Sequence, residues 1–223
     1  MKKKIHTLII FGSGPHAKMC FNEFLKNFKI KKVYFFNNIV DYNNLKYLNK
    51  KFEIIKDYKI LKKKINKNTY FFLGIGDNQK RKKIFNETLN KLGRLNWLSL
   101  ISRDAIVDKT VKIGCGTAVL PGTVINFQSK IGDHCILNTK CSIDHDCFLD
   151  NFVNISPGVN VAGNVLIKEG ARIGIGASVK EDLKIEKNVS IGANSFVNKN
   201  CKKNNTYIGL PAKIVEKKRK LKL

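Results

Sequence analysis

The sequence predicts a small α/β domain with a parallel sheet, followed by a parallel β-helix. Two observations carry this prediction. A strand, a glycine loop and an amphipathic segment follow one another at the start of the chain, and aliphatic residues recur every six positions through its second half. We place the first domain at residues 1–98 and the second at residues 99–223.

The first domain alternates apolar runs of strand length with segments of helical periodicity. This order indicates a small parallel, Rossmann-like sheet with helices packed on it. A glycine loop, Gly12-Ser13-Gly14-Pro15-His16-Ala17, joins the first strand to the first helix. The elements expected are strands at residues 6–11, 33–36 and 70–73 and helices at residues 18–28 and 78–92.

The glycine loop has the form of a dinucleotide fingerprint, because glycines allow close backbone approach and a helix N-terminus attracts phosphate. The acid that such a site needs is absent, since the second strand ends in Asn37 and Asn38. About three strands precede the β-helix, which is half of a full dinucleotide fold. The sequence therefore argues against NAD. The loop from Gly74 to Asp77 either closes a pocket beside the first loop or is a strand-to-helix turn with an Asp cap.

The second domain is predicted from its repeat. Seventeen positions at intervals of six residues, from Ile101 to Val197, are all aliphatic, and the positions four residues after each are small or apolar. A period of six fits neither a helix nor an alternating strand, but it suits a solenoid of short strands and turns, with three hexads in each coil of eighteen residues. Four cysteines fall in the small register and are expected in the core as inert thiols: Cys135, Cys141, Cys147 and Cys201.

The net charge of +25 raises the question of nucleic-acid binding. The lysines are spread through every segment among many Asn and Ile residues, a pattern typical of genome-wide base bias, so we expect no nucleic-acid partner and a solvated tail at residues 217–220. No run of eighteen apolar residues and no signal-peptide cleavage site occur, which predicts a cytoplasmic protein without a membrane span. All six cysteines are then expected to be reduced.

His145 is the candidate catalytic residue. Acetyl transfer to an amine or a hydroxyl needs a base, and histidine has an ordinary pKa of about 6.5. Asp146 can orient the ring, with Asp144 as the less favoured partner. Gly163 lies one coil further on and is expected to leave room for a ligand beside the imidazole. His134 and His6 have no such setting, and we expect His134 on the surface.

The block from Cys141 to Val165 resembles the sugar O-acyltransferase family of hexapeptide-repeat proteins, which includes sialic acid O-acetyltransferases and bacillosamine-pathway N-acetyltransferases. The resemblance covers nearly the whole chain. It implies a left-handed β-helix, acetyl-CoA as co-substrate without a metal, and a homotrimer whose active sites lie between adjacent β-helices. It also implies that His145 is the base and Asp146 its partner.

The resemblance assigns the remaining site residues as well. Asn154 stands where relatives often have a second histidine that contacts acetyl-CoA. The acetyl-CoA positions it implies are Asn154, Gly163, Ile175, Ala193, Gly209, Pro211 and Lys213. The first domain is expected to bind a nucleotide-linked sugar through Gly12, Ser13, Gly14, Pro15, His16, Asn37, Asn38 and Gly76.

The sequence thus favours N-acetylation of a nucleotide-linked 4-amino sugar in glycan synthesis. The nucleotide is left open among UDP, dTDP and GDP. O-acetylation of a sugar such as sialic acid uses the same base and remains an alternative. A scaffold that binds a sugar nucleotide without catalysis is an alternative of another class.

Overall fold

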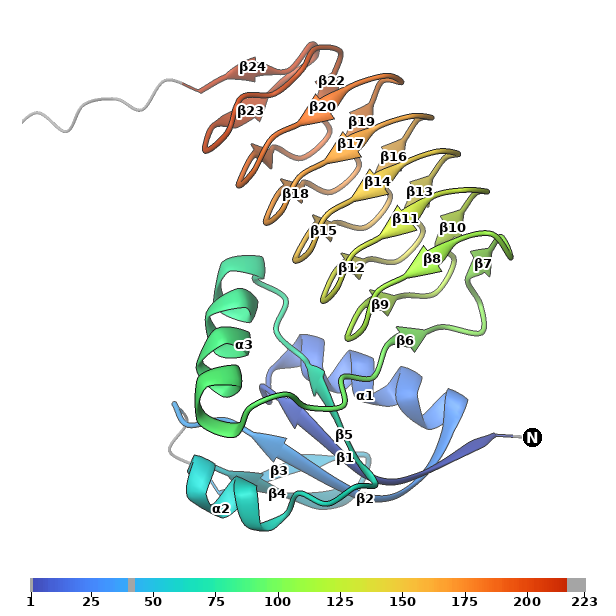
Figure 1. Ribbon diagram of the computed structural model, residues 1–223. Helices are drawn as coiled ribbons and strands as arrows, with labels where there is room; N and C mark the ends of the chain where they lie inside the picture. Colours follow the sequence, from blue (N-terminus) through green and yellow to red (C-terminus); the bar gives the residue numbers. More distant parts are fainter. Residues whose placement is uncertain (1, 40–42, 216–223) are drawn as a thin grey trace, which may run out of the picture.

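The computed structural model describes residues 2–39 and 43–215 of the 223-residue chain. The basic run at 217–220 lies outside these residues. Two bodies are evident in Figure 1: a sheet with helices on both faces, and a solenoid of short strands that rises from it. The predicted order of an α/β domain and a β-helix is confirmed.

The first body is built on a five-stranded sheet in the order β3-β4-β2-β1-β5. Its elements are β1 (Lys3–Phe11), α1 (Pro15–Asn27), β2 (Phe28–Phe36), β3 (Asn44–Tyr47), β4 (Lys50–Ile55), α2 (Tyr58–Lys63), β5 (Thr69–Leu73) and α3 (Asn78–Leu92). Strands β1, β2, β4 and β5 are parallel, whereas β3 pairs with β4 in an antiparallel hairpin.

The prediction of about three parallel strands was therefore incomplete. Leu48 and Asn49 form the hairpin turn with positive φ, and Leu45 and Ile54 are buried on its two strands. Apolar and polar residues do alternate on each strand, at Leu45-Lys46-Tyr47 and at Phe52-Glu53-Ile54, but each alternating run contains only two apolar residues, which is too short a pattern to identify a strand.

The two faces of the sheet are covered differently. On one face, α1 packs together with the first coils of the solenoid, through a cluster that joins Phe21 and Phe24 to Leu100 and Leu120. On the other face, α2 and α3 cover a second cluster around Phe11 and Trp97. The core of the first body is thus continuous with the side of the β-helix.

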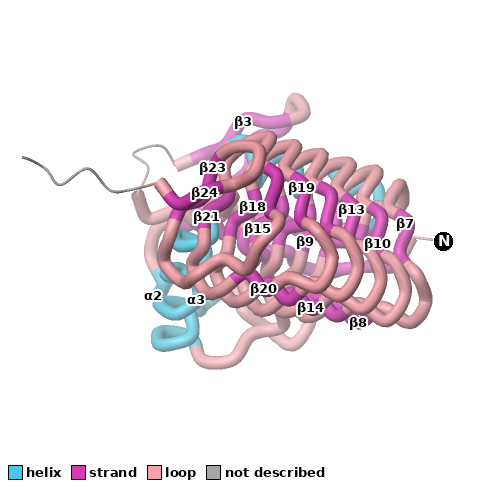
Figure 2. The backbone as a smooth tube through the Cα atoms, turned by 90° about the horizontal axis from the view of Figure 1, so that it is seen from above, coloured by secondary structure: helices cyan, strands magenta, loops and turns pink. Residues whose placement is uncertain are grey.

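The second body is a triangular solenoid of parallel sheets, in the arrangement typical of a left-handed β-helix. Its coils follow one another in the view of Figure 2. Face I contains β6 (Leu100–Ile101), β9 (Ala118–Val119), β12 (Ile136–Leu137), β15 (Asn154–Ile155), β18 (Arg172–Ile173), β21 (Ser190–Ile191), β23 (Thr206–Ile208) and the antiparallel β24 (Lys213–Ile214). Face II contains β7 (Ile106–Val107), β10 (Val124–Ile125), β13 (Ser142–Ile143), β16 (Asn160–Val161), β19 (Ser178–Val179) and β22 (Phe196–Val197). Face III contains β8 (Lys112–Ile113), β11 (Lys130–Ile131), β14 (Phe148–Leu149), β17 (Leu166–Ile167) and β20 (Lys184–Ile185).

The predicted registers are confirmed. Each of the seventeen aliphatic positions is the second residue of a strand, and all of them from Val119 onward are buried. Ile101 is 41% exposed, because it lies in the open first coil. The four cysteines of the small register are buried free thiols, and burial raises the pKa of Cys135 and Cys141 to about 12.

Helix α3 lies along the corner between faces III and I, which we call the III–I corner. Its first turns contact four successive coils at equivalent positions, eighteen residues apart. The contacts are Arg81 Nε to the His134 carbonyl (2.9 Å), Arg81 Nη2 to the Phe152 carbonyl (3.5 Å), Asn78 Nδ2 to the Gly170 carbonyl (2.6 Å) and Gln79 Nε2 to Asn188 Oδ1 (3.1 Å). The helix therefore sets the position of the first body along the solenoid.

His134 is not on the surface, contrary to the expectation. It is 1% exposed and packs against Phe85, Trp97 and Phe152 between the two bodies. Neither ring nitrogen has a hydrogen-bond partner among the described residues. Burial is the main cause that lowers the pKa of His134, to about 4. The hexad places His134 at a corner, and that corner is covered by Phe85 of α3, by Trp97 after the helix and by Phe152 one coil later.

Candidate active site

His145 lies at the corner between faces II and III, in the turn from β13 to β14. Such turns need a residue with positive φ, and Asp146 takes that position with φ 56°. Aspartate tolerates this conformation better than most residues. The turn brings Asp146 Oδ2 to 2.9 Å from His145 Nδ1. Both side chains remain nearly half exposed, so the imidazole and the carboxylate are accessible from solvent.

Asp144 has a different role in the same turn. Its Oδ1 accepts hydrogen bonds from the His145 backbone N–H (2.8 Å) and from Asn126 Nδ2 (2.9 Å) one coil away. The Asn126 hydrogen bond and then the backbone N–H hold the pKa of Asp144 below its usual range. Of the two candidate carboxylates, Asp146 is therefore the one that contacts the imidazole, and Asp144 stabilises the turn.

The imidazole is held between two neighbouring coils. Phe127, eighteen residues before it, stacks on the ring with centroids 5.4 Å apart and planes inclined by 15°. Gly163, eighteen residues after it, lies so close that a Cβ there would be 2.6 Å from His145 Cε1 and Nε2. The space beside Gly163 is therefore filled by the ring itself, and our expectation that it was open for a ligand was wrong. Phe127 was missed, although stepping one coil from His145 finds it.

A cavity of about 450 Å³ lies at the carboxyl end of the first sheet, where ligands of open parallel sheets bind. It contains Gly12, Asn37 and Asn38 from the predicted acceptor site, and it adds Lys80, Lys83 and Glu87 from α3, which the sequence analysis missed. Its complete lining is Phe11, Gly12, Phe36, Asn37, Asn38, Ile39, Ile75, Lys80, Lys83, Ile84 and Glu87.

The other predicted acceptor residues do not line this cavity; they lie next to its lining, in the glycine loop and the Gly74–Gly76 turn. Asn37 Nδ2 donates to Ser13 Oγ (2.9 Å), which ties the end of β2 to the glycine loop. Pro15 is the first residue of α1 and Gly14 its N-cap. His16 is half-buried behind the loop, where burial and then the charge of Arg81 lower its pKa to about 4. Gly76 does not line the cavity; it lies against His16, next to Ile75, which does.

The predicted acetyl-CoA residues lie on other parts of the solenoid. Ile175 and Ala193 are exposed one coil apart on the corner between faces I and II. Gly209, Pro211 and Lys213 are exposed at the end of the solenoid, where Lys213 begins β24 and the other two precede it. Within one chain, His145 and Gly163 are on the II–III corner and Asn154 is on face I. One protomer therefore brings Gly163 to the predicted base but leaves the other predicted acetyl-CoA residues on other parts of the solenoid.

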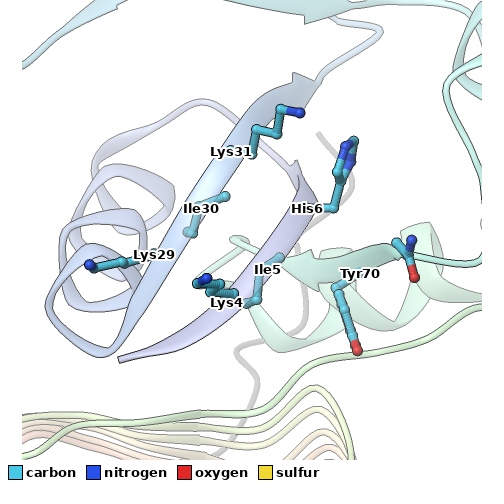
Figure 3. A pocket seen from close by; sticks show the side chains of 8 residues that line it. Lys4, Ile5, His6, Lys29, Ile30, Lys31 and Tyr70 are labelled. Carbon is cyan, nitrogen blue, oxygen red and sulfur yellow. The ribbon is translucent and has the colours of Figure 1, made fainter. Parts of the chain in front are cut away.

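Two further hollows contain none of the predicted site residues. A hollow of about 470 Å³ (Figure 3) is lined by residues of β1, β2 and β5 near their amino-terminal ends, His6 among them, the end of a parallel sheet where substrates are not bound. A hollow of about 570 Å³ lies over face II and includes Asp144, the residue before His145.

The described residues contain no cluster of three or more side chains that could hold a metal ion. None of the described helices combines the length and the apolar character that a membrane crossing requires.

Comparisons with known proteins agree with this arrangement. Residues 7–88 match the family of the PglD N-terminal domain. The acetyltransferase domain of PglB from Neisseria gonorrhoeae, solved in complex with acetyl coenzyme A, is 28% identical; the match covers 95% of this chain and 100% of that chain, with a TM-score of 0.82. PerB from Caulobacter crescentus, solved in complex with CoA and GDP-perosamine, is 29% identical over 94% of this chain and 97% of that chain, with a TM-score of 0.81. No curated protein matches the sequence.

The fold and its similarity to these enzymes define the chain as a hexapeptide-repeat acetyltransferase. More particularly, it consists of a PglD N-terminal domain followed by a hexapeptide-repeat acetyltransferase domain. The family resemblance stated from the sequence is thereby confirmed.

Proposed function

We propose that this protein transfers an acetyl group from acetyl-CoA to the amine of a nucleotide-linked 4-amino sugar, with His145 as the general base. In this division, residues 1–98 bind the acceptor and residues 99–223 carry acetyl transfer. The observation that carries the proposal is the imidazole of His145, which is nearly half exposed and is oriented by Asp146 through a contact of 2.9 Å at Nδ1.

The reaction needs one proton acceptor. The neutral amine attacks the thioester carbonyl carbon, a C–N bond forms, and His145 Nε2 accepts the proton from nitrogen. The C–S bond then breaks and CoA leaves as a thiolate. Asp146 keeps the ring in the tautomer that has a free Nε2 and stabilises the imidazolium that forms. A backbone N–H near the thioester stabilises the tetrahedral oxyanion.

The nature of the cavity at the glycine loop supports a nucleotide-linked acceptor. Its walls are apolar at Phe11, Phe36 and Ile84, whereas Lys80 and Lys83 are on α3 beside them. An apolar slot suits a base and a ribose, and lysine ammonium groups attract a diphosphate. The solved PerB complex contains CoA and GDP-perosamine, a nucleotide-linked amino sugar.

We further propose a homotrimer with the active site between neighbouring β-helices. One protomer separates His145 from Ile175 and Ala193 by a whole face of the solenoid, so a second copy is needed to complete the site. The face between them is face II. Three exposed aromatic residues on it and beside it give a neighbour an apolar surface to cover: Phe196 on face II, Phe127 at the II–III corner and Phe148 on face III. A monomer that is stable and active in solution would contradict this part of the proposal.

The proposed function is tested by offering the protein acetyl-CoA with UDP-, dTDP- and GDP-linked 4-amino sugars and with free sialic acid, and by identifying the product by mass spectrometry. We expect acetylation of at least one 4-amino sugar nucleotide, with an amide that resists mild base. Turnover of sialic acid alone, to a base-labile ester, would establish O-acetylation instead. No turnover with any acceptor would contradict the proposal.

A further inference from the structure

One buried side chain connects the acceptor cavity to the β-helix. The guanidinium of Arg81 is 1% exposed and donates to four backbone carbonyls. Nη1 donates to Ile75 (2.9 Å) and Gly76 (3.2 Å), in the turn between β5 and α3. Nε and Nη2 donate to His134 (2.9 Å) and Phe152 (3.5 Å), on two successive coils.

Among the described residues, no ion pair includes Arg81. The carboxylate of Asp77 acts on its charge from a distance and is itself engaged as the N-cap of α3. A buried cation whose direct partners are carbonyl dipoles contributes little net stability compared with a well-packed apolar side chain. The role of Arg81 is therefore geometric: its planar guanidinium fixes the positions of four carbonyls relative to one another.

Asn154 reinforces one of these contacts from the other body. It is 9% exposed at the start of β15, and its Nδ2 donates to the Gly76 carbonyl at 2.8 Å. The Gly76 carbonyl thus receives one hydrogen bond from α3 and one from face I of the solenoid. Among the described residues, Asn154 is the only one of the solenoid whose side chain hydrogen-bonds to this turn.

The Gly74–Gly76 turn is part of the acceptor pocket. Ile75 lines the cavity, and Gly12 of the glycine loop packs so tightly on the turn that a Cβ there would be 3.0 Å from the Gly74 carbonyl. On its other side Gly76 lies against His16. A displacement of the turn would therefore move one wall of the cavity and the loop that faces it.

We propose that Asn154 and Arg81 are positioning residues that hold the Gly74–Gly76 turn, and with it the acceptor, in place against the β-helix. This inference rests on the proposed function for the identity of the acceptor. It places the action of Asn154 on the acceptor side of the reaction, whereas a histidine-like contact with acetyl-CoA would place it on the donor side. If Asn154 acts on the acceptor side, its loss changes the KM for the acceptor. If it acts on the donor side, its loss changes the KM for acetyl-CoA.

Asn154→Ala is the primary test, because it removes one hydrogen bond to the turn and leaves Arg81 in place. We expect kcat/KM for the acceptor to fall about three- to tenfold, the effect of one hydrogen bond, while the KM for acetyl-CoA stays within about twofold of the parent. Asn154→Asp, which turns the donor into an acceptor facing the Gly76 carbonyl, should lower kcat/KM for the acceptor further. Gln79→Ala is the matched control, since it removes an amide hydrogen bond between the same two bodies without touching the turn.

Arg81→Lys provides a second variant that keeps the charge and loses the fork. The emission of Trp97, the only tryptophan, reports whether the junction is intact, because its ring is 5.0 Å from that of His134. With an unchanged emission spectrum, Arg81→Lys should also lower kcat/KM for the acceptor and spare acetyl-CoA.

A raised KM for acetyl-CoA with an unchanged acceptor constant in Asn154→Ala would overturn the inference, and so would equal losses in Asn154→Ala and Gln79→Ala. If the parent turns over no acceptor, the proposed function fails by itself, and titration with UDP, dTDP and GDP then decides the inference. Weaker binding of the nucleotide in Asn154→Ala than in Gln79→Ala supports it. Equal binding in the two variants, or no binding by the parent, overturns it.

Discussion

Replacing His134 by phenylalanine should remove a large part of the acid sensitivity of the fold. In the folded chain its pKa is lowered from 6.5 to about 4, first by burial; Arg81 adds to the lowering and Asp133 opposes it. Because the unfolded chain then binds the proton more readily, stability rises with pH between about 4 and 6.5, is fully present above 6.5, and is lost as pH falls through this window.

The pKa of His134 differs by about 2.5 between the unfolded and the folded chain. This difference lowers the free energy of unfolding by about 3 kcal/mol between pH 7 and pH 4. Phenylalanine suits the site, because Phe152 occupies the equivalent corner position one coil later with the same positive φ. It also removes two buried ring nitrogens that lack partners, a defect that costs about 1–3 kcal/mol.

The assay is urea unfolding followed by Trp97 emission at a series of pH values from 7 to 4, for the parent, His134→Phe and the control His6→Gln. We expect the free energy of unfolding to fall with acid by about 3 kcal/mol less in His134→Phe than in the other two. The comparison uses the slope of the free energy of unfolding against pH, so a change in stability that the substitution causes equally at every pH cancels. Identical slopes in the three proteins would refute the buried, neutral state of His134.

Three further predictions concern the surroundings of His145. Gly163→Ala should lower kcat at least about tenfold, since the new Cβ would lie 2.6 Å from ring atoms of His145; parental kcat would contradict this geometry. Asp146→Asn should lower kcat about ten- to a hundredfold with little change in either KM, because the imidazole loses its orienting carboxylate; an equal loss in Asp144→Asn would argue against Asp146 as the partner. Cys147→Ala should keep kcat within about twofold, because burial raises the pKa of this thiol to about 11 and no thiolate forms near neutral pH; a loss of kcat above tenfold in a folded variant would show that the thiol takes part.

The β-helix could be predicted from sequence because its order is local. Every hexad meets the same surroundings as the hexad before it, so a residue such as Ile143 or Cys141 has its burial set by its place in the repeat. The contact between His145 and Asp146 was also accessible, because both residues are in one turn. Phe127 needed only the further step of one coil.

The parts that sequence reasoning missed depend on contacts between distant segments. His134 occupies a corner like many others, and much of its cover comes from distant residues, Phe85 of α3 and Trp97 after it. Asn154 was assigned from resemblance, and its contact with Gly76 joins residues 78 positions apart. The hairpin of β3 and β4 was missed for another reason, since its alternating apolar runs are too short to identify a strand.

The most direct test of the central claim is the rate of acetyl transfer by His145→Gln at saturating acetyl-CoA and acceptor, compared with the parent and with His6→Gln. Loss of the general base should lower kcat by about 10²- to 10⁴-fold, with thermal unfolding and nucleotide binding unchanged. His6→Gln should match the parent. An undiminished kcat in a folded His145→Gln variant would show that His145 is not the base.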